Sequence, residues 1–134
     1  MRKFTLSLLS SALIGFGFAA QAAELIMVEE PGCAWCAKWE SELGEIYPKT
    51  SEGKYAPLRK VKLHDLKRSD GPDTLGVMPA RPVVFTPTFL LVEDGKELAR
   101  LQGYPGEDFF WGLLEQMLLE NTDYVTPPVE QSGS

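Results

Sequence analysis

The chain has 134 residues, 44% of them hydrophobic, and a formal net charge of −6. An acidic chain without a basic patch interleaved with aromatic residues is repelled by phosphate, which argues against nucleic acid as a partner. The length suits one globular domain with a modest core and leaves no room for a second domain.

Residues 1–22 are predicted to be a secretory signal peptide. Arg2 and Lys3 precede an apolar stretch over residues 4–20, and the stretch ends in a small-x-small cleavage pattern. A transmembrane anchor is the alternative, but serines and glycines interrupt the stretch and no basic stop-transfer cluster follows. Cleavage after Ala22 leaves 112 residues with a net charge of −8. We therefore expect a periplasmic protein that is not membrane-embedded after cleavage.

Hydrophobic periodicity predicts the elements of the remaining chain. The first part of the chain is expected to form a strand buried on both faces over 24–29, a turn at Pro31-Gly32 and an amphipathic helix from Cys33 to Tyr47 that Pro48 stops. A loop over 49–56, a half-packed strand over 58–64 and a long loop over 65–82, with at most one helical turn around 73–77, are expected to follow. The last part is expected to form a strand over 88–93, a hairpin turn at Asp94-Gly95, a return strand over 96–102 and a helix from Glu107. The domain is expected to span residues 23–125, followed by a disordered tail over 126–134.

Two of these elements carry specific packing predictions. The return strand has Leu98 and Leu101 as its apolar members. The last helix has a broad apolar stripe that is expected to pack on the sheet, with a partner-binding face as the alternative. The stripe consists of Phe109, Phe110, Leu113, Leu114, Met117 and Leu118.

The only two cysteines, Cys33 and Cys36, lie two residues apart where the first strand gives way to a helix. This spacing is typical of a redox-active dithiol. A helix beginning near Cys33 directs N–H groups and its positive dipole end at that sulfur, so Cys33 is the candidate nucleophile. Cys36, one turn deeper on the same face, is the candidate resolving thiol. A structural disulfide is the alternative, although it would close too short a loop to constrain the unfolded chain much.

Tryptophan and histidine residues offer further candidates. Trp35, between the cysteines, is expected to be an exposed contact for partners, whereas Trp39 is expected in the core. His64 is the only histidine, and we expect it at the surface or at a strand end because one His and two Cys are too few ligands for a closed zinc site. Copper handling by both cysteines and His64 is a further alternative, without a supporting methionine or histidine cluster. We expect no cofactor and no metal.

The order of elements makes the first two strands parallel and the last two antiparallel, giving an α/β fold with a mixed four-stranded sheet flanked by helices. Together with Cys33-Ala34-Trp35-Cys36, Thr86-Pro87-Thr88 and Gly103, this order resembles the thioredoxin superfamily over most of residues 24–120. The resemblance implies that Pro87 is cis and lies beside the cysteines, and that Thr86 and Pro87 position the substrate. An edge-strand proline without a role in binding is the alternative.

Longer motifs resemble periplasmic thioredoxin-like proteins of the SoxS type from bacterial sulfur-oxidation systems. They are Pro-Gly-Cys-x-Trp-Cys-Ala-Lys-Trp, Phe-Thr-Pro-Thr-Phe and Gly-Tyr-Pro-Gly-Glu-Asp-Phe-Phe-Trp. The resemblance implies a periplasmic thiol–disulfide oxidoreductase that reduces a cysteine-containing partner, such as a sulfur-carrier protein, and is recharged by a membrane thiol reductase. A non-catalytic thioredoxin-like binding module with a structural disulfide is the alternative. One departure is Met27, six residues before the first cysteine, where the family often has a buried acid, so no general base for Cys36 is evident.

Charges near the motif predict the direction of the reaction. Glu29, Glu30 and Glu40 surround the cysteines against Lys38 alone, and negative charge opposes a thiolate. A less stabilised thiolate makes the dithiol more reducing. The sequence therefore predicts a reductant.

Overall fold

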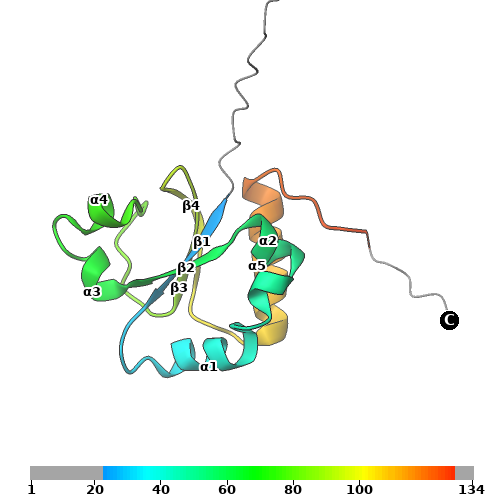
Figure 1. The fold of residues 1–134 in the computed structure, drawn as a ribbon, viewed down its shortest axis with the longest axis horizontal. Coiled ribbons are helices and arrows are strands. Elements are labelled where there is room, and N and C mark those ends of the chain that lie inside the picture. Colours follow the sequence, from blue (N-terminus) through cyan, green and yellow to red (C-terminus); the bar gives the residue numbers. More distant parts are fainter. Residues whose placement is uncertain (1–22, 129–134) are drawn as a thin grey trace, which may run out of the picture.

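The computed structural model describes residues 23–128, which form a four-stranded sheet with helices on its two faces (Figure 1). The elements follow in the order β1 (Glu24–Glu29), α1 (Ala34–Leu43), the 3-10 helix η1 (Tyr47–Lys49), α2 (Ser51–Tyr55), β2 (Leu58–Lys62), α3 (Leu63–Leu66), α4 (Gly71–Leu75), β3 (Thr88–Glu93), β4 (Lys96–Gln102) and α5 (Glu107–Asn121). The predicted signal peptide and residues 129–134 of the predicted tail lie outside the described residues, and residues 126–128 belong to no helix or strand. None of the helices within residues 23–128 is long and apolar enough to cross a membrane.

The strands lie in the order β2-β1-β3-β4. β1 pairs with β2 in parallel and with β3 antiparallel, and β3 pairs with β4 antiparallel. The predicted mixed four-stranded sheet is therefore confirmed. β1 is an interior strand with Leu25 and Met27 in one core cluster and Ile26 and Val28 in the other, which explains why its sequence shows no polar alternation.

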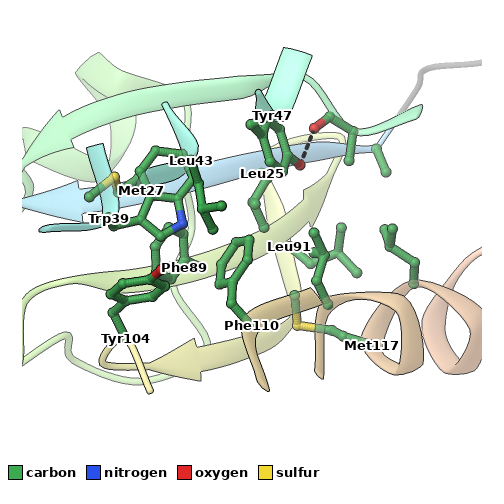
Figure 2. Close-up of a cluster of buried hydrophobic side chains, with 14 of the residues drawn as sticks. Leu25, Met27, Trp39, Leu43, Tyr47, Phe89, Leu91, Tyr104, Phe110 and Met117 are labelled. Carbon is green, nitrogen blue, oxygen red and sulfur yellow. Dashed lines mark hydrogen bonds between the residues drawn. The ribbon is translucent and has the colours of Figure 1, made fainter. Parts of the chain in front are cut away.

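The larger cluster packs α1 and α5 against one face of the sheet (Figure 2). Trp39 of α1 is fully buried, with its ring centroid 5.4 Å from that of Phe89 and 5.7 Å from that of Phe110. Tyr47 closes one side of this cluster, and its hydroxyl donates a hydrogen bond of 2.7 Å to the carbonyl of Ala56. Buried aromatic pairs contribute about 0.5–1.5 kcal/mol each beyond the area they bury. They fix α1 on the sheet and, with it, the position of Cys36.

The opposite face is covered by α3 and by the segment that leads to β3. We call residues 78–82 of this segment the strap. Met78 exchanges backbone hydrogen bonds with Gly95 and Glu97, at 2.6 and 3.1 Å. Arg100 of β4 donates to the carbonyls of Arg81 and Pro82. The strap is therefore fastened to the edge strand just before the chain reaches residues 86 and 87.

An ion pair between Glu97 and Arg100 anchors the strap, and both side chains are only 3% exposed, with 2.5 Å between the nearest charged atoms. Burial alone would raise the pKa of Glu97. Hydrogen bonds from Arg100 and from the backbone N–H of Ala80, and the charges of Arg100 and Arg81, outweigh burial and lower this pKa. Glu97 therefore remains ionised in its buried position at neutral pH.

The first helix is shorter than predicted. α1 ends at Leu43 rather than Tyr47, next to Gly44, because glycine has a poor helix propensity. Pro48 does not stop α1; it stands at the start of η1, where its missing N–H needs no partner. The stretch expected as a loop over 49–56 contains α2, whose first turn is capped by Thr50 accepting from the backbone N–H of Gly53.

The second strand and the following loop also differ from the prediction. β2 ends at Lys62, and Leu63 begins α3, which buries Leu63 and Leu66. The alternation of apolar and polar residues predicted a strand as far as His64, but its last apolar residue, Leu63, is buried by α3 instead. The long loop predicted for 65–82 holds the end of α3, which was not expected, and the short helix α4, which overlaps the single helical turn expected around 73–77.

Two apolar patterns were too broad. Leu98 falls at a register irregularity, since Leu91 pairs with Ala99 and Val92 with Glu97, and it is 38% exposed. In α5 only four of the six predicted stripe residues are buried, namely Phe110, Leu114, Met117 and Leu118. Phe109 and Leu113 are exposed.

Replacing Arg100 with methionine should lower the free energy of unfolding by about 3–5 kcal/mol, because it leaves Glu97 as an unpaired buried charge. Because the folded-state pKa of Glu97 lies below its unfolded value, its contribution is complete above about pH 4.3 and disappears as the pH falls through the folded pKa. Urea unfolding at several pH values measures both effects, and the variant should lose less stability on acidification than the wild type.

Arg68→Met is the control, since Arg68 and Asp70 form an exposed pair that is worth less than about 1 kcal/mol. Equal losses in the two variants would contradict an anchoring role for Arg100.

Candidate active site

The turn between β1 and α1 places Cys33 at the start of the helix. Pro31 ends the strand, and Gly32 has φ +79°, a left-handed conformation that favours glycine. Cys33 is the N-cap of α1, with extended backbone angles, and its Sγ accepts a hydrogen bond of 3.2 Å from the backbone N–H of Cys36. The carbonyl of Cys33 accepts the N–H of Ala37 at 3.1 Å. The sulfur therefore lies where helix N–H groups and the helix dipole favour negative charge.

Cys33 and Cys36 form a disulfide, with their Cα atoms 5.3 Å apart. Their surroundings differ. Cys33 is half-buried, whereas Cys36 is 6% exposed and belongs to the core cluster that includes Met27 and Trp39. A partner can thus reach Cys33 more easily than Cys36, which agrees with their predicted order of reaction.

Thr86 and Pro87 are each held by one hydrogen bond. The Thr86 hydroxyl donates to Oε1 of Glu30 at 2.8 Å, which ties residue 86 to the turn before Cys33. The N–H of Gly103 donates to the carbonyl of Pro87 at 2.7 Å. The peptide bond between Thr86 and Pro87 is cis, as the resemblance implied.

Exposed apolar side chains occur on the same segments. Trp35 is 56% exposed, Val84 57% and Phe85 62%. We call these three residues the apolar rim. Of the predicted positioning residues, Trp35 lies between the two cysteines on α1, Thr86 is hydrogen-bonded to the dithiol turn through Glu30, and Pro87 follows Thr86 across the cis peptide bond. Trp39, in contrast, is in the core, as predicted.

His64 lies apart from the cysteines, exposed on α3. Within residues 23–128 there is no cluster of three or more His, Cys, Asp or Glu side chains arranged to hold a metal ion.

A hollow of about 430 Å³ opens beside the dithiol. We call it the hollow, and its lining consists of Glu29, Glu30, Gly32, Cys33, Ala34, Cys36, Ala37, Glu40 and Lys60. Glu40 forms an ion pair with Lys60, and Glu29 forms one of 2.8 Å with Lys62. Two of the three carboxylates that line the hollow therefore form ion pairs with lysines of β2.

The sequence-based account of the local charge was incomplete for this reason. Lys38 pairs with Glu42 and is not part of the lining, whereas Lys60 and Lys62 were missed. The parallel register places Met27 opposite Lys60 and Glu29 opposite Lys62. The alternation of lysines with Val61 in β2 was the available signal, and it becomes informative once the pairing of β1 with β2 is known.

The thioredoxin-like domain family matches residues 19–118. The chain belongs to this family. The solved structure of the periplasmic thioredoxin SoxS from Paracoccus pantotrophus, in its reduced form, is similar at 43% sequence identity and a TM-score of 0.65, over 73% of this chain and 97% of that one.

More distant solved structures share the fold alone. The thioredoxin Mala s 13 of Malassezia sympodialis is 17% identical over 73% of this chain and 79% of its own, with a TM-score of 0.52. The thioredoxin NaTrxh of Nicotiana alata is 23% identical over 77% of this chain and 76% of its own, also with a TM-score of 0.52. No curated protein matches the chain.

Family membership and the cysteine pair together establish the class of chemistry. A thioredoxin-like domain with a Cys-x-x-Cys pair at the start of α1 is a thiol–disulfide oxidoreductase. The prediction of an enzyme of this class is confirmed.

The unequal burial of the two sulfurs predicts unequal alkylation of the reduced protein. Iodoacetamide at neutral pH should modify Cys33 at least tenfold faster than Cys36, because Cys33 is accessible and capped by helix N–H groups. Peptide mass spectrometry over a time course measures both rates. A Cys33→Ala variant provides the rate of Cys36 alone, and equal rates at the two positions would contradict the assignment of the accessible nucleophile.

Proposed function

We propose that the protein is an exported, periplasmic thiol–disulfide oxidoreductase that reduces a disulfide or modified cysteine on a partner protein. The observation that carries the proposal is the half-buried Cys33 at the N-cap of α1, beside the Thr86–Pro87 loop. Similarity to a periplasmic thioredoxin supports the compartment, as does the signal peptide predicted for residues 1–22.

The reduced protein would act in two steps. The Cys33 thiolate attacks one sulfur of the partner disulfide, forms a mixed disulfide and releases the first partner sulfur, which takes up a proton. Cys36 then loses its proton, and its thiolate attacks Sγ of Cys33. The bond between Cys33 and the partner breaks, the second partner sulfur leaves and is protonated, and the Cys33–Cys36 disulfide remains. Two electrons have passed to the partner.

The partner would be a cysteine-containing periplasmic protein, such as a sulfur carrier, and the apolar rim supports binding to a protein surface. Exposed aromatic residues next to a reactive group favour such contacts. A membrane thiol reductase would return the Cys33–Cys36 disulfide to the dithiol.

The direction of electron flow is supported by Glu30. Glu29 and Glu40 have lysine partners, whereas Glu30 accepts from the neutral Thr86 hydroxyl. Among the described residues, Glu30 is thus the one carboxylate on the lining of the hollow without an ion-pair partner, and its negative charge opposes the thiolate of the reduced form.

Cysteine replacements test the two-step reaction. Cys33→Ser should abolish the reduction of insulin disulfides, because no thiolate remains to attack. Cys36→Ser should form a mixed disulfide with the substrate that persists, because no thiol remains to resolve it. Non-reducing gels and mass spectrometry detect the trapped species. Full activity of Cys33→Ser would refute the proposed nucleophile, and a wild-type disulfide that dithiothreitol cannot reduce would favour a structural role.

The hydrogen bond between Thr86 and Glu30 predicts an effect on substrate binding. Thr86→Val removes the hydroxyl, frees the 86–87 loop from the dithiol turn and should raise KM about two- to tenfold with little change in kcat, the scale of one hydrogen bond. Glu30→Ala should have a similar effect, and the double variant should add little to either.

Glu30→Gln is the conservative comparison, since its amide oxygen can still accept from Thr86, and its KM should stay near the wild-type value. Thr74→Val, at an exposed position on α4, is the matched control. A KM for Thr86→Val equal to that of Thr74→Val would contradict the positioning role.

A further inference from the structure

The wall of the hollow next to Cys36 is formed by the ion pair of Glu40 and Lys60. Glu40 lies four residues after Cys36 on α1, so both side chains occupy the same face of the helix. Lys60 belongs to β2, the strand that pairs in parallel with β1. Both members of the pair and both cysteines line the hollow. The pair therefore shares the hollow with both cysteines, and its two members come from different elements.

Cys36 also packs in the larger core cluster of buried hydrophobic residues. Met27, opposite Lys60 in the parallel register, is fully buried, and its thioether carries no charge and cannot take up a proton at neutral pH. Trp39 belongs to the same cluster. A thiolate at either cysteine therefore shares the hollow with the charged groups that line it.

Four charged side chains line the hollow. Glu29 lies at the end of β1 and forms an ion pair with Lys62. Glu30 lies in the turn and accepts a hydrogen bond from Thr86. Glu40 belongs to α1 and Lys60 to β2. Only Glu40 and Lys60 form an ion pair with both members on the lining.

We propose that the Glu40–Lys60 ion pair sets the reduction potential of the Cys33–Cys36 disulfide. Reduction adds two electrons and two protons to the disulfide, and loss of one proton leaves a thiolate. The Glu40 carboxylate destabilises this negative charge and the Lys60 ammonium stabilises it, so in the intact pair the two electrostatic effects on the thiolate oppose each other. The inference rests on the dithiol exchange of the proposed function and assigns Glu40 and Lys60 as positioning residues for that exchange.

Single replacements should move the potential in opposite directions. Glu40→Gln leaves the Lys60 ammonium unbalanced, which stabilises the thiolate and makes the disulfide easier to reduce. We expect the equilibrium constant for its reduction by glutathione to rise about three- to tenfold, equivalent to about 14–30 mV for a two-electron couple. Lys60→Gln leaves the Glu40 carboxylate unbalanced, and the constant should fall by a similar factor. The pH dependence of thiolate absorbance should shift to lower pH in the first variant and to higher pH in the second.

The double variant Glu40→Gln/Lys60→Gln should return close to the wild-type constant. A merely structural ion pair would not produce shifts of opposite sign that cancel. Lys38 and Glu42 provide the matched control, because they form an ion pair of similar exposure on the same helix but do not line the hollow. Lys38→Gln and Glu42→Gln should each change the constant less than twofold.

The outcomes separate this inference from the proposed function. Opposite shifts for Glu40→Gln and Lys60→Gln, beyond those of the controls, support it. Unchanged constants, or shifts of the same sign, in proteins that still exchange with glutathione overturn the inference and leave the oxidoreductase intact. A wild-type disulfide that exchanges with neither glutathione nor dithiothreitol overturns both.

Discussion

Cys33 has two roles that cannot be separated, because the same sulfur that meets the solvent also caps α1. Its Sγ accepts the N–H of Cys36 at 3.2 Å, at a position where helices usually have Ser, Thr, Asp or Asn. A thiolate is a stronger acceptor than a disulfide sulfur, so reduction strengthens the cap. The geometry depends on Gly32, whose positive φ turns the chain out of β1, and on β1 itself, which is buried on both faces.

The second half of the site is held by other means. Residues 86 and 87 lie at least fifty positions beyond the cysteines in the chain, and three separate contacts place them. The strap is fixed to β4 through Glu97 and Arg100, the Pro87 carbonyl is fixed by Gly103, and the Thr86 side chain reaches Glu30. Rigid elements thus surround a reactive pair whose own loop is short, which is the arrangement that precise positioning requires.

Much of the fold was predictable because its signals are local. β1, β3, β4 and the start of α5 follow from apolar runs, the Asp-Gly turn and the acidic first turn, and the cysteine spacing identified the site. Predictions failed where tertiary packing decides. Leu63 continued the alternation of β2 but packs from α3, and Leu98 lies at a register irregularity that only the pairing reveals. Lys60 was missed because its approach to Glu40 depends on the parallel register of two strands over thirty residues apart.

The interior position of β1 has a consequence for how the chain folds. The first strand in sequence lies between β2 and β3, and its partners in β3 are 60 to 68 residues away. No part of the sheet that contains β1 can be completed until residues 88–92 have joined it, so loop-closure entropy is lost before most of the core is gained. Folding of this domain is therefore governed by contacts of high contact order. A chain interrupted before β3 can pair β1 only with β2, and one edge of its central strand, to which the cysteine turn is attached, remains without a partner.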